Sequence, residues 1–124
     1  MKKILILDLE TTVQRLDGKI DNSPFNPDNR CVSAHYCWLG EPVQTLVFHH
    51  NDKPNPDSPA PLREALKQAD MLVAHNAKFD VMWLMEMGFS IPDCIYCTMI
   101  GEYVLAKGQR VQLSLKATAE RRAA

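Results

Sequence analysis

The chain has 124 residues, 46% of them hydrophobic and 23% charged, and its formal net charge is −1. This composition is typical of a soluble globular domain and excludes a disordered or collagen-like chain. Apolar runs such as Ile4 to Leu7 are far shorter than the about 18 residues of a membrane-spanning helix, and Asp8 follows too early for a signal peptide. We therefore expect one cytoplasmic domain, without a membrane segment and with reduced cysteines.

The first half of the chain predicts strands. Residues 2–9 contain the continuous apolar run, which is typical of a central strand buried on both faces. Residues 13–29 are polar and rich in Asn, Pro and Gly, so we expect a long loop there. Two further strands are predicted at residues 31–39 and 43–49, and the turn between them indicates a hairpin.

The second half predicts helices that alternate with short strands. After a proline-rich linker at residues 51–61, Pro61 favours the start of a helix over residues 62–69, and residues 71–74 form a short buried strand. Asn76 is the expected N-cap of a helix over residues 77–87, which Gly88 ends. Its apolar spacing turns three side chains toward the core: Phe79, Met82 and Trp83.

The last third continues this alternation. A connector with a short strand is expected at residues 90–96, a helix at 98–106 that Gly108 stops, and a helix at 115–122 with Ser114 as its N-cap. A three-strand meander followed by strand–helix units predicts an α/β fold, in which helices flank a mixed β-sheet.

Two carboxylates follow the buried first strand. Because strand side chains alternate, Asp8 and Glu10 point to the same face, about 6.6 Å apart along the strand. Carboxylates this close repel each other, and a divalent cation such as Mg²⁺ or Mn²⁺ would relieve the repulsion. The alternative is a solvated pair at a strand end, because Asp-x-Glu is a common pattern.

A third carboxylate lies in the helix after the 71–74 strand. Asn76 and Asp80 are four residues apart, so on a helix they share a face at the carboxyl end of that strand, where open sheets bind ligands. Asp80 stands among apolar residues. Interaction with the helix N-terminus, worth about 0.3–1 kcal/mol, would explain it structurally. A metal ion would explain it functionally.

Together these two segments form a recognisable pattern. Leu7-Asp8-Leu9-Glu10-Thr11-Thr12 resembles the first motif of the DnaQ-like (DEDD) 3′–5′ exonucleases, which have a ribonuclease H-like fold. The sequence Asn76-x-x-Phe79-Asp80 resembles their second motif. Residues 96–105 and 113–116 are similar to the following segment in proofreading domains of phage and bacterial family A DNA polymerases.

The resemblance implies an enzyme that removes nucleotides from DNA 3′ ends with two Mg²⁺ or Mn²⁺ ions. Asp8 would contact both ions, Glu10 the first, and Asp80 the second, directly or through water. Thr11 and Asn76 would lie near the 3′-terminal nucleotide. The implied partners are single-stranded DNA or DNA 3′ ends, and a polymerase domain or a following segment of chain.

The sequence departs from the family pattern in two places. Cys97 stands where many relatives have Asp. The third motif, an Asp with Tyr or His four residues before it, is absent, because no Tyr or His of the sequence has an acidic residue four positions later. We therefore expect residues 1–124 to be a single partial exonuclease domain, about the first two-thirds, with little activity alone unless Glu102 or Glu120 replaces the missing acid.

Two other interpretations stay open. A non-catalytic nucleic-acid-binding or interaction module, derived from such an exonuclease, could hold phosphate with the basic end at residues 106–124. The Cys94-x-x-Cys97 pair could bind zinc together with Cys31 and Cys37, but one strand would place these last two roughly 20 Å apart, too far for one ion. His75 is expected to be a hydrogen-bonded histidine rather than a metal ligand.

Overall fold

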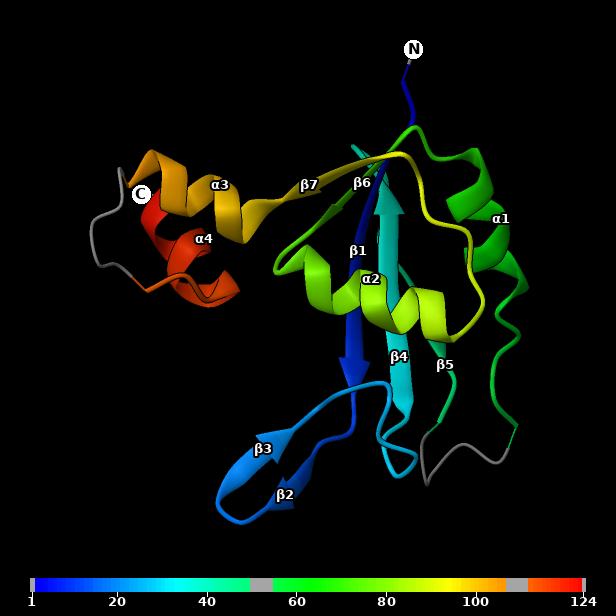
Figure 1. Cartoon of the computed structure of the whole chain (residues 1–124). Helices are drawn as coiled ribbons and strands as arrows, with labels where there is room; N and C mark the ends of the chain where they lie inside the picture. The colour runs from blue at the N-terminus through cyan, green and yellow to red at the C-terminus, as the bar shows by residue number, and fades with distance from the viewer. Residues whose placement is uncertain (1, 50–54, 107–111, 124) are drawn as a thin grey trace.

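The computed structural model describes residues 2–49, 55–106 and 112–123, and a five-stranded sheet runs through its centre (Figure 1). The strand order is β5-β4-β1-β6-β7. Antiparallel pairing joins β1, Ile4–Thr11, to β4, Cys31–Trp38, and β4 to β5, Gln44–Val47. Parallel pairing adds β6, Met71–Ala74, and β7, Cys94–Cys97, on the other side of β1. This is the expected mixed sheet, a meander followed by strand–helix units.

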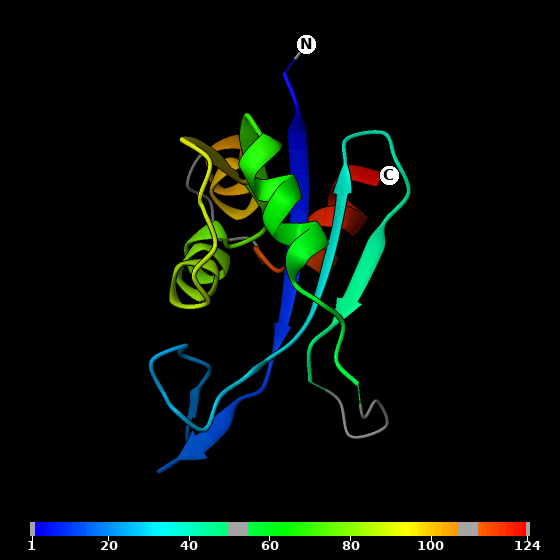
Figure 2. The same cartoon turned by 90° about the vertical axis from the view of Figure 1, so that its right-hand side faces the viewer.

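One face of the sheet carries the hydrophobic core. Leu5, Leu7 and Leu9 of β1 point into it, together with Leu72 of β6. Helix α1, Ala60–Gln68, and helix α2, Ala77–Glu86, cover this face and bury Leu62, Leu66, Trp83 and Leu84 (Figure 2). Apolar burial of this kind stabilises a domain by about 25 cal/mol per Å².

The opposite face of β1 is less covered than its sequence predicted. Ile4 and Ile6 are only partly buried, and Asp8 and Glu10 are exposed. The expectation that both faces are buried is therefore wrong for β1. The reason is that α1 and α2 both lie on the core side, so the second face is left more open.

Helix α2 ends as its sequence predicts. Gly88 adopts φ +85° just beyond the helix, and the N–H of Phe89 donates to the carbonyl of Leu84 at 2.9 Å, which satisfies the last turn. Trp83 is buried and Phe79 packs against the core. Met82 is only partly buried and lies outside that cluster, so its expected core position is wrong.

Helices α3, Thr98–Leu105, and α4, Leu115–Ala123, pack against each other beside the β7 edge of the sheet (Figure 1). The expected N-cap of α4 is confirmed, because the N–H of Ala117 donates to Ser114 Oγ at 3.2 Å. The predicted helix stop at Gly108 lies outside the described residues, as does part of the proline-rich linker.

The expected long loop at residues 13–29 contains a hairpin instead. Strands β2, Gln14–Leu16, and β3, Lys19–Asp21, pair antiparallel around Asp17 and Gly18, both with positive φ, at 52° and 77°. Two-residue turns of this kind match the twist of the two strands, and Asp-Gly favours them.

In the described part of the chain, no helix is long and apolar enough to cross a membrane.

Candidate functional site

The two central parallel strands differ in length, and this opens one side of β1. Strand β6 pairs only with Ile4, Leu5 and Ile6 of β1, although β1 continues to Thr11. On the other side β1 stays paired with β4 as far as Thr11. The carboxyl half of β1 therefore has no strand on the β6 side, and helix α2, which follows β6, approaches it there.

Asp8 and Glu10 lie on this open half. Both side chains are exposed and point away from the core, opposite His35 and Ser33 of β4. Their common face follows from the alternation along β1, as the sequence predicted. Just beyond them, the register with β4 shifts between Glu10 and Thr11, an irregularity that redirects the strand where it leaves the sheet.

Asp80 reaches the same half of β1 from helix α2. It is 2% exposed, and its carboxylate accepts a hydrogen bond from the backbone N–H of Leu9. Burial raises the pKa of Asp80 to about 7, the negative charge of Asp8 adds to the rise, and the Leu9 hydrogen bond opposes it. Two carboxylates from β1 and α2 therefore repel each other across this side of the strand.

The chemistry of these donors fits a hard divalent cation. Asp8 and Asp80 offer oxygen ligands, and a cation would relieve both the burial of Asp80 and its repulsion by Asp8. The nearby thiol of Cys31 is no competing ligand, because burial and the charge of Asp80 together raise its pKa to about 12. Within residues 2–49, 55–106 and 112–123, however, no group of three or more His, Cys, Asp or Glu side chains is arranged to hold one ion.

Asn76 occupies the expected N-cap position of α2 without capping it. Its backbone is left-handed, with φ 58° and ψ 56°, and its side chain makes no cap hydrogen bond. The predicted position of the N-cap is therefore correct, but the predicted side-chain cap is absent. Asn tolerates the left-handed conformation better than most residues, and here this conformation turns the chain sharply from β6 into α2. The exposed Asn76 amide stands at the carboxyl end of β6.

His75 joins three segments next to this turn. Its Nε2–H donates to the backbone carbonyl of Leu113, so its Nδ1 accepts the hydroxyl of Thr98 at 2.8 Å. The prediction of a hydrogen-bonded histidine is confirmed. A cavity of about 230 Å³ lies beside it on the second face of the sheet, with Asp8, His35, Val73, Thr98 and Leu115 in its wall.

The cysteines do not form the alternative zinc site. All four are free, and β4, with Cys31 and Cys37, is separated from β7, with Cys94 and Cys97, by two intervening strands, about 14 Å across the sheet. Cys97 instead opens α3, and its Sγ accepts the N–H of Ala77 at 3.3 Å. Burial would raise the pKa of Cys97, but four backbone N–H groups together lower it: those of Ala77, Ile100, Met99 and Asn76.

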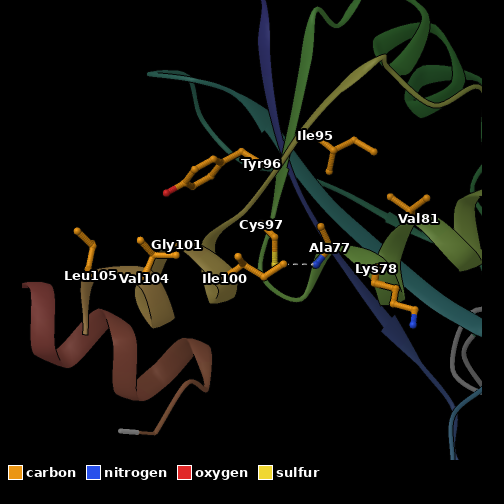
Figure 3. Close-up of a pocket in the computed structure, with 10 residues that line it drawn as sticks. All are labelled: Ala77, Lys78, Val81, Ile95, Tyr96, Cys97, Ile100, Gly101, Val104 and Leu105. Atoms are coloured by element: carbon orange, nitrogen blue, oxygen red, sulfur yellow. Dashed lines mark hydrogen bonds between the residues drawn. The ribbon is translucent and has the colours of Figure 1, made fainter. Parts of the chain in front are cut away.

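A larger apolar pocket, of about 630 Å³, opens between α2, β7 and α3 (Figure 3). Ile95, Ile100 and Val104 line it, and Lys78 is its charged residue. The Tyr96 ring lies over Gly101, where the absence of a side chain leaves room for it. None of the predicted site residues lines this pocket.

The acids considered as substitutes for the missing third motif lie elsewhere. Glu102 is buried in α3 and accepts two hydrogen bonds from Arg122 of α4, at 2.9 and 3.1 Å. Glu120 is exposed on α4. This ion pair engages Arg122, one of the basic residues at the carboxyl end of the chain. Lys107 and Arg110, two other basic residues of this end, lie outside the described residues.

Sequence reasoning missed one contact at the site. Trp83, one turn after Asp80, donates from Nε1 to the backbone carbonyl of Asn22 at 3.1 Å and so fixes the segment after β3 to α2. The sequence signal for this contact was the prediction that Trp83 faces the core, because an indole N–H that is removed from water needs an acceptor.

No protein-family model matches the sequence, and no curated protein matches it. Two solved structures of Brucella melitensis NrnC are similar at 17% identity: one with bound Mg²⁺, with a TM-score of 0.68 over 97% of this chain, and one with a TM-score of 0.69 over 98%. This chain spans 53% and 52% of their lengths. Exonuclease X in complex with 5′-overhanging duplex DNA matches at 18% identity with a TM-score of 0.47, over 97% of this chain and 73% of that one.

At such identity the likeness to NrnC concerns the fold alone. An antiparallel meander, with its first strand in the centre, is followed by two parallel strands and helices on the core face. The chain has a ribonuclease H-like α/β fold, of the kind found in DnaQ-like exonucleases.

Proposed function

We propose that this chain is the metal-binding part of a 3′–5′ exonuclease that removes nucleotides from DNA 3′ ends. The observation that carries the proposal is the meeting of Asp8 from β1 and Asp80 from α2 at the open half of the central strand. The ribonuclease H-like fold supports it, as does the bound Mg²⁺ of NrnC, which has the same fold. On this proposal residues 1–124 are one partial domain of proofreading type.

Each residue has a distinct role in the proposed site. Asp8 would contact two Mg²⁺ or Mn²⁺ ions, Glu10 the first, and Asp80 the second, directly or through water. Such ions would supply a lowered pKa for an attacking water and charge stabilisation for the leaving 3′ oxygen. Thr11, at the irregular end of β1, and Asn76, at the end of β6, contact the 3′-terminal nucleotide.

Metal binding can be tested apart from catalysis. We expect wild type to bind Mn²⁺ in calorimetry and Asp8→Asn to bind it at least about tenfold more weakly, because the substitution removes charge from both proposed ions. The matched control is Asp93→Asn, which neutralises an exposed acid outside the site. Equal Mn²⁺ affinity in wild type and Asp8→Asn would contradict the assignment.

The activity itself is tested on single-stranded DNA carrying a label near its 5′ end, with Mg²⁺ or Mn²⁺. We expect shortening from the 3′ end in the chain extended through a third acidic motif, and little shortening in residues 1–124 alone. DNA binding without cleavage in both proteins would favour the alternative, a non-catalytic nucleic-acid-binding module.

A further inference from the structure

Exposed apolar side chains gather on one small unit at the carboxyl end of β1. The unit, here called the hairpin segment, is residues 13–30: the β2–β3 hairpin and the loop that leads to β4. The hairpin projects beyond the carboxyl end of β1, the strand that carries Asp8 and Glu10 (Figure 1). Phe25 is 67% exposed, Ile20 64% and Val13 47%.

The loop that carries Phe25 is held by many polar contacts. Asp21 accepts the N–H of Ser23 and the side-chain amide of Asn26, both at 2.9 Å. The buried Asn29 donates to the carbonyls of Asp21 and Ser23, both at 3.0 Å. The N–H of Phe25 itself donates to Ser23 Oγ at 3.1 Å. A loop so fixed exposes its phenyl ring without needing it for the core.

Both carboxylate-bearing elements anchor this loop. On the β1 side, the N–H of Thr12 donates to the carbonyl of Arg30, and the Thr12 hydroxyl accepts the N–H of Arg30 and donates to Asn29 Oδ1. On the α2 side, Trp83 donates to the carbonyl of Asn22. Thr12 lies two residues after Glu10, and Trp83 three after Asp80. The position of Phe25 is therefore tied to the same two elements that place the candidate metal ligands.

Basic residues accompany the apolar ones. Arg15 and Ile20 are direct cross-strand partners, so the guanidinium and the apolar side chain share one face of the hairpin. Lys19 and Arg30 are exposed on the same segment. Of its three acids, Asp21 is engaged inside the loop, while Asp17 lies at the hairpin turn and Asp28 near the loop end. Exposed rings and aliphatic groups beside cations suit bases joined by phosphates.

We propose that the hairpin segment binds single-stranded DNA upstream of the 3′ end, with a base stacked on Phe25 and a phosphate held by Arg15. The inference rests on the proposed function, because the nearby carboxylates would receive the terminal nucleotide. A strand that lies on the hairpin segment enters the site along the end of β1, between this segment and α2.

The test measures binding rather than turnover. The affinity for a fluorescein-labelled thymidine oligonucleotide is measured by fluorescence anisotropy. The buffer contains Ca²⁺ in place of Mg²⁺, because the flexible coordination of Ca²⁺ differs from the octahedral geometry of Mg²⁺ and the aim is to measure binding without turnover. We expect Phe25→Ala to weaken binding about 5- to 150-fold, the range of one lost base–aromatic stack, and Phe25→Tyr to keep wild-type affinity. Arg15→Ala should reduce the slope of log affinity against log salt concentration by about the amount expected for one lost phosphate contact.

Leu39→Ala is the matched control, because Leu39 is 63% exposed and follows β4 at the opposite end of the sheet. It should bind like wild type, and circular dichroism should show all variants folded. Equal affinity in Phe25→Ala and wild type, or equal loss in Phe25→Ala and Phe25→Tyr, would overturn the inference. Phe25-dependent binding of DNA without any binding of Mn²⁺ would instead support the inference and contradict the proposed metal site.

Discussion

Asp80 bears most of the electrostatic cost of the site. A carboxylate 2% exposed, beside a second carboxylate, is stable at neutral pH only if it keeps a proton, gains a cation or receives strong hydrogen bonds. The chain provides one such bond, from the N–H of Leu9. In metal-free protein this residue therefore favours the protonated state up to a pKa of about 7.

This predicts how the stability of the metal-free protein varies with pH. The pKa of Asp80 is raised on folding, so the folded chain holds a proton between about pH 4 and 7 that the unfolded chain has lost, and stability falls as the pH rises through this window. Asp80→Asn cannot ionise. We expect it to increase the free energy of unfolding on the order of 2 kcal/mol at pH 8 and little at pH 4. Urea unfolding with EDTA measures both.

Asp21→Asn provides a control of opposite sign. Hydrogen bonds from Asn26 and Ser23 lower the pKa of Asp21, so its contribution is present above the unfolded pKa and is lost as the pH falls through the folded one. The variant should be less stable than wild type at pH 8 and should approach it in acid. A stabilised Asp21→Asn, or an Asp80→Asn that is not stabilised at pH 8, would contradict this account.

At the scale of elements, the sequence predicted the sheet well because its signals are local. The apolar run of β1 and the alternation that turns Asp8 and Glu10 to one face need only the period of a strand. The β2–β3 hairpin was missed although Asp17-Gly18 is a turn signal, because its flanking residues are polar. The contact of Trp83 with Asn22 joins residues that are 61 positions apart in the chain, and the left-handed backbone of Asn76 belongs to the sharp β6–α2 turn. No local pattern encodes either of them.

The contact between α3 and α4 includes an ion pair whose two partners are unequally buried. Glu102 is 3% exposed and the Arg122 side chain 52%, and two hydrogen bonds join them. We expect Arg122→Ala to lower the free energy of unfolding, by less than the loss of a fully buried pair would, because water reaches the guanidinium. Lys116→Ala, on an exposed position of the same helix, should cost less than about 0.5 kcal/mol.

Chemical unfolding distinguishes these two variants, and hydrogen exchange of the α4 amides locates the effect. Arg122→Lys keeps the charge but loses the paired hydrogen bonds, so it should lie between wild type and Arg122→Ala. Equal stability of Arg122→Ala and Lys116→Ala would show that the pair contributes nothing to the packing of α4.

At the scale of the whole molecule, the apolar surface is uneven. The core face of the sheet is covered by α1 and α2, whereas α3 exposes Ile100, Val104 and Leu105 beside the pocket of Figure 3. Contiguous exposed apolar surface of this kind is uncommon on monomeric proteins. The signal in the sequence was the apolar composition of residues 99–105, which did not reveal which side would be covered.

Polar substitutions on this face should therefore be tolerated. We expect Ile100→Lys with Val104→Lys to change the free energy of unfolding by less than about 1 kcal/mol, because both side chains are already exposed. The double variant should bind an apolar fluorescent dye less than wild type does. Leu62→Lys, at a fully buried position of α1, is the contrasting variant and should prevent folding. Dye binding that does not change in the double variant would contradict this description of the surface.

Because β6 is short, one backbone amide of β1 is sensitive to the protonation and metal binding of the candidate site. Where β6 stops pairing, the N–H of Leu9 donates to the Asp80 carboxylate instead of to a neighbouring strand. Protonation of that carboxylate, or its capture by a cation, changes the acceptor of a single backbone amide in the middle of the sheet. The amide resonance of Leu9 in a two-dimensional nitrogen–proton NMR spectrum should therefore move with pH around 7 in metal-free protein and become insensitive to pH in Asp80→Asn.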